Sequence, residues 1–82
     1  MPFLSGFERV AMEKGRQEGL QEGQREGLVQ ALELVLRLRF AGSAAQLLPR
    51  IRAIAETDRL RELIAASERA STIEEFEKAL RQ

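Results

Sequence analysis

The stretch that decides the fold is residues 7–40, FERVAMEKGRQEGLQEGQREGLVQALELVLRLRF. It contains no proline and its pattern is helical throughout, so we expect one helix of about 50 Å at 1.5 Å per residue. A compact chain of this size has a radius of gyration near 12 Å and a diameter of only about 30 Å. The helix is therefore too long to be covered by its own domain, so part of it must stand in solvent, contact another chain or fray.

The two halves of this predicted helix differ in composition. Residues 28–40 are densely apolar, which predicts an inward stripe of Leu28, Ala31, Leu32, Val35 and Leu38, widened by Leu34 and Leu36. Residues 13–27 contain a single large apolar residue and carry the tetrad repeat RQEG, LQEG, QREG. Residues 28–40 therefore predict a packed core, and residues 13–27 a largely polar surface.

Glycines recur every four residues within 13–27, and four of them inside a helix cost about 4 kcal/mol relative to alanine. Three glutamates repeat at the same spacing and repel one another. We interpret residues 13–27 as an association segment, where small residues let a partner helix approach closely. A flexible tether is the alternative, and a phosphate-binding loop lacks its motif. The predicted partner interface comprises Gly15, Gly19, Gly23, Gly27, Leu20, Glu18, Glu22, Glu26, Arg16, Arg25 and Leu28.

The remainder, residues 43–82, predicts a small helical domain that packs on residues 28–40. We expect a left-handed cap at Gly42 and a capping box from Ser43 to Gln46, then a helix over 44–55 that is kinked or split at Pro49. A third helix should run to residue 69 from a cap at Thr57 or Asp58, and a fourth to residue 81 from a capping box formed by Ser71 and Glu74. Residues 1–6 are a leading segment, with a further box from Ser5 to Glu8. The predicted fold is all-α: one long helix followed by three short ones.

Composition excludes several classes of function. Cysteine and histidine are absent, which removes disulfides, thiol nucleophiles and imidazole chemistry, and thirteen basic residues balance thirteen acidic ones. No run of 18 apolar residues is present. We expect a cytoplasmic homo-oligomer that is not an enzyme and uses no metal or cofactor. Two clusters of charged residues suggest other functions. A phosphate-contacting set would comprise Arg37, Arg39, Arg50 and Arg52. A cation-binding set would comprise Glu74, Glu75 and Glu77.

Residues 7–40 also resemble the C-terminal region of the recombination-promoting nuclease and putative transposase family, which carries "ERxxxEKG" and repeated "xQEG" units. Its "LxRRFG" is similar to residues 36–42, its "RI" to residues 50–51 and its "SLEEF" to residues 71–76. Pro49 departs from the family pattern, where a helix position is expected. The family's nuclease domain is of the PD-(D/E)XK type and is absent here, because neither lysine has an acid two residues before it.

The resemblance implies a small helical domain that follows a nuclease. It also implies a function: short C-terminal products of this family bind the full-length nuclease and restrain it. We therefore expect a non-catalytic module that self-associates and binds the matching tail of a full-length nuclease as its inhibitor. The alternative is a nucleic-acid-binding accessory domain of a transposase-like nuclease.

Overall fold

The long helix begins and ends almost where the sequence predicts. The computed structural model describes residues 6–82, and its first helix, α1, spans Gly6–Phe40, so Gly6 belongs to the helix and not to the leading segment. The expected box at Ser5 lies outside the described residues. No strand occurs within residues 6–82, which confirms the all-α fold class.

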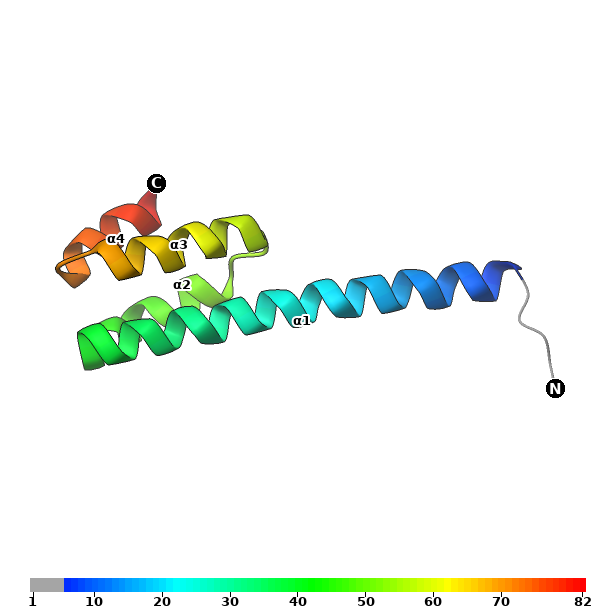
Figure 1. Cartoon of the computed structure of the whole chain (residues 1–82), viewed down its shortest axis with the longest axis horizontal. Coiled ribbons are helices and arrows are strands. Elements are labelled where there is room, and N and C mark those ends of the chain that lie inside the picture. Colours follow the sequence, from blue (N-terminus) through cyan, green and yellow to red (C-terminus); the bar gives the residue numbers. More distant parts are fainter. Residues whose placement is uncertain (1–5) are drawn as a thin grey trace.

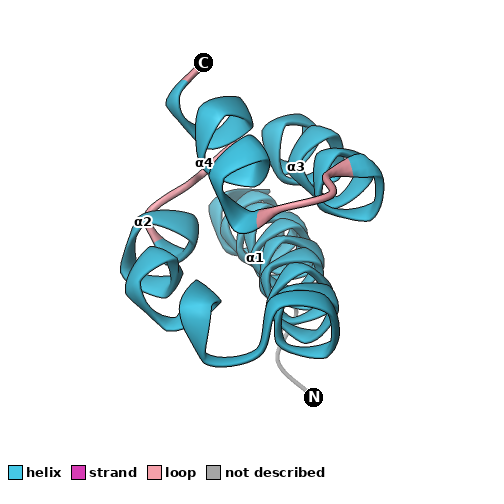
Figure 2. Cartoon of the chain, turned by 90° about the vertical axis from the view of Figure 1, so that its left-hand side faces the viewer, coloured by secondary structure: helices cyan, strands magenta, loops and turns pink. Residues whose placement is uncertain are grey.

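Four shorter elements follow α1: the 3-10 helix η1 (Ala41–Leu47), α2 (Leu48–Arg52), α3 (Thr57–Arg69) and α4 (Ile73–Arg81). Figure 1 shows that the chain reverses after α1, runs back beside it through η1 and α2, and reverses again so that α3 lies along α1. α4 packs on α3, and the end-on view places these elements on one side of α1 (Figure 2). We call residues 41–82 the helical cap.

The core lies between the helical cap and the C-terminal half of α1. Side chains from every element contribute to one cluster, which includes the fully buried ring of Phe76. Its buried members are Val29, Leu32, Leu36, Ala44, Leu47, Ile51, Leu60, Leu63, Ala70 and Phe76. Because each short helix buries only one or two apolar residues, none of them has a core of its own.

The inward face of α1 differs from the predicted stripe. Val29, Leu32 and Leu36 are buried, whereas Leu34 and Leu38 are 55% and 77% exposed. Ala31 is also exposed, and Leu28 and Val35 are only half-buried. The prediction was wrong at Ala31, Leu34 and Leu38, whereas Leu28 packs against the core as expected. Apolar residues occupy more than half of the helix circumference over residues 28–38, so periodicity does not distinguish which part of it meets the helical cap.

The connection after α1 is tighter than predicted. Ala41, not Gly42, takes the left-handed conformation, with φ 51°. The Ser43 hydroxyl donates to the Phe40 carbonyl at 2.7 Å, so it does not cap a following helix. The expected helix over 44–55 is divided into η1 and α2, and Pro49 stands in the first turn of α2, where its missing N–H costs no hydrogen bond.

The predicted caps of the last two helices are displaced by one residue. Thr57 and Asp58 lie within α3, so neither occupies the N-cap position. That position is held by Glu56, whose side chain makes no capping hydrogen bond. Before α4 the cap is Thr72, whose hydroxyl accepts from the Glu75 backbone N–H at 3.2 Å. The Glu75 carboxylate in turn accepts from the backbone N–H of Ser71 at 2.9 Å. The chemistry of a capping box is therefore present, one position later than expected.

Candidate association surface

The N-terminal part of α1 extends beyond the helical cap. Residues 6–20, which we call the free segment, are exposed at every position and project past α3 in Figure 1. The chain measures 59 × 22 × 18 Å and has a radius of gyration of 17.4 Å. That value exceeds the roughly 12 Å of a compact chain of this length. The mismatch between helix length and body size is therefore a feature of the structure.

The four repeated glycines lie within this uninterrupted helix and face open space. A Cβ atom added at Gly15, Gly19, Gly23 or Gly27 would meet no atom within 4 Å. No close approach within residues 6–82 therefore uses their missing side chains. Each glycine still costs about 1 kcal/mol relative to alanine in a helix.

The column of glutamates has cations within its own chain. Glu18 lies 4.0 Å from Lys14, and Arg25 lies 2.7 Å from Glu22 and 3.5 Å from Glu26. Cations from a partner helix would relieve the same repulsion. The intrahelical pairs relieve the repulsion without one, so the glutamates by themselves do not indicate a partner.

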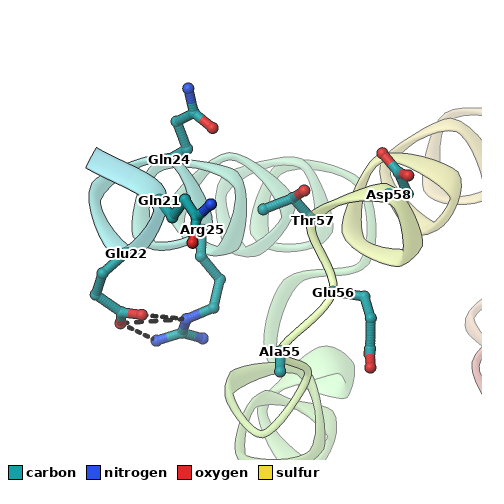
Figure 3. Close-up of a pocket in the computed structure, with 8 residues that line it drawn as sticks. All are labelled: Gln21, Glu22, Gln24, Arg25, Ala55, Glu56, Thr57 and Asp58. Carbon is teal, nitrogen blue, oxygen red and sulfur yellow. Dashed lines mark hydrogen bonds and ion pairs between the residues drawn. The ribbon is translucent and has the colours of Figure 1, made fainter. Parts of the chain in front are cut away.

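Arg25 also anchors the middle of α1 to the helical cap. Its Nη1 atom donates to the carbonyls of Arg52 at 3.2 Å and Ile54 at 3.3 Å. The hydrogen bond with Glu22, drawn in Figure 3, raises the pKa of Arg25 and lowers that of Glu22. An open hollow of about 620 Å³ lies between this arginine and the start of α3. Leu28 packs against the core, so Arg25 and Leu28 both contact their own chain.

Two other predicted interface residues remain on the surface. Leu20 is 56% exposed, with no cover from the helical cap. The Arg16 guanidinium donates to Glu13 one turn earlier, and both side chains are exposed. Of the residues that sequence analysis assigned to an interface, the glycines, Leu20, Arg16 and the three glutamates are accessible in the single chain.

The sequence analysis assigned only Leu20 to an interface among a set of apolar side chains that are exposed. Every large apolar residue that is exposed within residues 6–82 lies on α1, although the helical cap forms half of the chain. These residues are Phe7, Val10, Met12, Leu20, Leu34 and Leu38. Scattered exposed apolar residues are ordinary, but their confinement to one helix is informative. The sequence carries a signal for these exposed residues, because residues 7–40 contain more apolar residues than one face of a helix can hold.

Three arginines perform a structural role that composition did not reveal. Each donates from α1 or α3 to carbonyl groups at the C-terminal end of another helix, where four carbonyls lack helical partners. The pairs are Arg25 with the end of α2, Arg39 with the carbonyls of Ser67, Glu68 and Ala70 after α3, and Arg59 with those of Ala79, Leu80 and Gln82 after α4. Arg25 and Arg39 join the helical cap to α1, and Arg59 joins α4 to α3.

The arginines considered for phosphate binding are largely engaged within the chain. Arg39 donates to the α3 carbonyls, and its guanidinium carbon lies 5.1 Å from the centre of the Phe40 ring. Arg52 and Arg37 both pair with Glu33, at 2.7 and 3.7 Å. Since paired guanidinium groups would have to leave these partners to contact phosphate, the cluster does not form a prepared anion site.

Glu33 is a buried charge whose pairing predicts a pH dependence of stability. The hydrogen bond from Arg52 lowers the pKa of Glu33 below its ordinary value of 4.5, against the opposing effect of burial. The unfolded state then binds more protons than the folded state. The stabilisation is therefore complete above pH 4.5 and is lost as the pH falls through the lower folded pKa.

We expect Glu33→Gln to lower the free energy of unfolding at neutral pH by about 1.5 kcal/mol, the lower end for a hydrogen bond to a charged group, because Arg52 is exposed. The difference from the native chain should vanish in acid. Urea unfolding between pH 3 and 7 measures it, and Glu62→Gln on the surface of α3 is the control. An equal loss at every pH would contradict the assignment.

Acidic residues of α4 do not form a metal site. Within residues 6–82 no group of carboxylates is arranged to hold a metal ion, and Glu75 is engaged with the backbone N–H of Ser71.

None of the described helices is long and apolar enough to cross a membrane. Comparison of the chain with protein-family models, curated proteins and solved structures finds no match.

Proposed function

We propose that this chain is a non-catalytic association module. In this proposal α1 is the binding element, and the helical cap supports the C-terminal half of α1. The observation that carries the proposal is the exposed free segment, a helix with no support from the rest of the chain. Its glycines make an isolated helix unfavourable, and contact with a partner helix would offset that cost.

The proposed partners are a second copy of the chain and a full-length nuclease whose tail has the same sequence pattern. This part of the proposal rests on the resemblance of residues 7–40 to the tails of that nuclease family. If a tail and this chain share the α1 pattern, a contact that pairs two copies of α1 also pairs the chain with the tail. Binding would then shift the nuclease by mass action into a mixed oligomer and inhibit it.

Sedimentation equilibrium tests the self-association. We expect a mass above 9.3 kDa at micromolar concentration, falling towards it on dilution. A mass of 9.3 kDa across the micromolar range would overturn the proposal.

A second measurement tests the nuclease partner separately. A catalytically inactive nuclease with a matching tail should co-sediment with the chain, and the same nuclease without its tail is the control. Equal binding to both forms would exclude the tail as the binding element, and retention of neither would exclude the nuclease as a partner.

A further inference from the structure

Four of the six exposed large apolar residues of α1 follow a seven-residue repeat on one face of the helix, whereas Phe7 and Met12 lie outside its two core positions. With Val10, Ala31 and Leu38 at the first core position of the repeat, Leu20 and Leu34 fall at the second, as in a coiled coil. Gln17 and Gln24 also occupy the first position, and Gly6, Glu13 and Gly27 the second. We call these residues the seam.

The seam lies opposite the helical cap. The buried residues Val29 and Leu36 occupy the outermost position of the same repeat, about half a turn from Leu34. A helix that docks on the seam would therefore meet no obstruction from the helical cap. The glutamates at 18, 22 and 26 lie on the cap side of α1, away from the seam.

Apolar residues are concentrated at the two ends of the seam. Near the N-terminal end of α1, Val10 is 68% exposed and the neighbouring Phe7 is 90% exposed. Near the C-terminal end of α1, Leu34 and Leu38 are exposed. The stretch between them holds Glu13, two glutamines and Gly27, interrupted only by Leu20 and Ala31. An occupant of the seam must therefore carry apolar groups at both ends and polar or small groups between them.

We infer that the seam is occupied by the α1 helix of a second copy, antiparallel and aligned so that Val10 of each chain meets Leu34 of the partner subunit. This inference deepens the proposed function and rests on it. In that register, paired residue numbers sum to 44, and both apolar ends are covered. A shift of one repeat in either direction leaves one apolar end of each helix uncovered.

Side-chain size agrees with this register. In three of the five seam pairs a large residue faces a small one: Leu38 faces Gly6 of the partner subunit, Gln17 faces Gly27 of the partner subunit, and Glu13 faces Ala31 of the partner subunit. Alternation of large and small residues fills a helix–helix interface without voids or overpacking.

Charge separates the antiparallel from the parallel arrangement. A parallel pair in register would place Glu13 against Glu13 of the partner subunit and, twice by symmetry, Arg9 against Lys14 of the partner subunit, which makes three repulsive contacts in the dimer. The antiparallel register has two, both between Arg9 and Arg37 of the partner subunit. These contacts lie at the rim, and Arg37 has its own Glu33 within 3.7 Å.

Single cysteines test the inference directly, because the chain has none. We expect an equimolar mixture of Val10→Cys and Leu34→Cys to form a disulfide-linked dimer, while each variant alone forms none. A bond within one chain is impossible, because each variant carries a single cysteine. Circular dichroism verifies that both variants stay helical.

The matched control is a mixture of Glu18→Cys and Glu26→Cys, whose numbers also sum to 44 but which lie off the seam. It should not cross-link. Cross-linking of Val10→Cys alone would overturn the antiparallel arrangement, and cross-linking of the control in place of the seam pair would overturn the assigned face. A dimeric mass without seam cross-links overturns the inference and leaves the proposed function standing, whereas a monomeric mass overturns both.

Discussion

Replacement of Phe76 by alanine is expected to lower the free energy of unfolding by about 3–5 kcal/mol, the usual cost of removing a buried aromatic side chain. The ring is fully buried in the core cluster, it is the buried residue of α4, and α4 packs on α3. A domain of this size has only a small margin of stability. The variant should therefore be partly unfolded at room temperature, which far-ultraviolet circular dichroism in urea would measure.

Two controls accompany this variant. Phe76→Leu keeps most of the apolar volume and should recover more than half of the loss. Met12→Ala removes an exposed side chain of α1, which is 61% exposed and lies off the seam, and should change stability by less than about 0.5 kcal/mol. If Phe76→Ala cost no more than Met12→Ala, α4 would not dock on the core.

The second large effect is expected at Leu32, and it should differ sharply from that at Val35. Both residues belong to the stripe that periodicity predicts, but Leu32 is fully buried in the structure and Val35 is half-buried. We expect Leu32→Ala to cost about 2–5 kcal/mol, the range for a buried leucine that leaves a cavity. Val35→Ala should cost about 1 kcal/mol, because it removes less apolar area from a site that is already partly wet.

Chemical denaturation of both variants at several protein concentrations separates stability of the single chain from any contribution of association. The difference between the two sites should persist at every concentration. Equal losses at Leu32 and Val35 would mean that α1 turns a different face to the helical cap.

Much of this fold follows from the sequence. The absence of proline between residues 7 and 40 and the helical pattern of that stretch predict one long helix, and Gly42, Pro49, Thr57 and Ser71 mark the breaks within about two residues. These signals are local, because backbone geometry and capping depend on neighbours in the chain. The mismatch between a helix of about 50 Å and a small domain is likewise a matter of counting residues.

Only the tertiary structure decided which face of α1 is buried and what the charged residues do. Apolar residues occupy more than half of the helix circumference over residues 28–38, so the position of the helical cap selects Val29, Leu32 and Leu36 as core and leaves Leu34 and Leu38 exposed. Arg39 and Ala70 are 31 residues apart, and their hydrogen bond forms because packing brings a helix end to the guanidinium. Such contacts depend on the mutual placement of whole helices, which no spacing along the chain records.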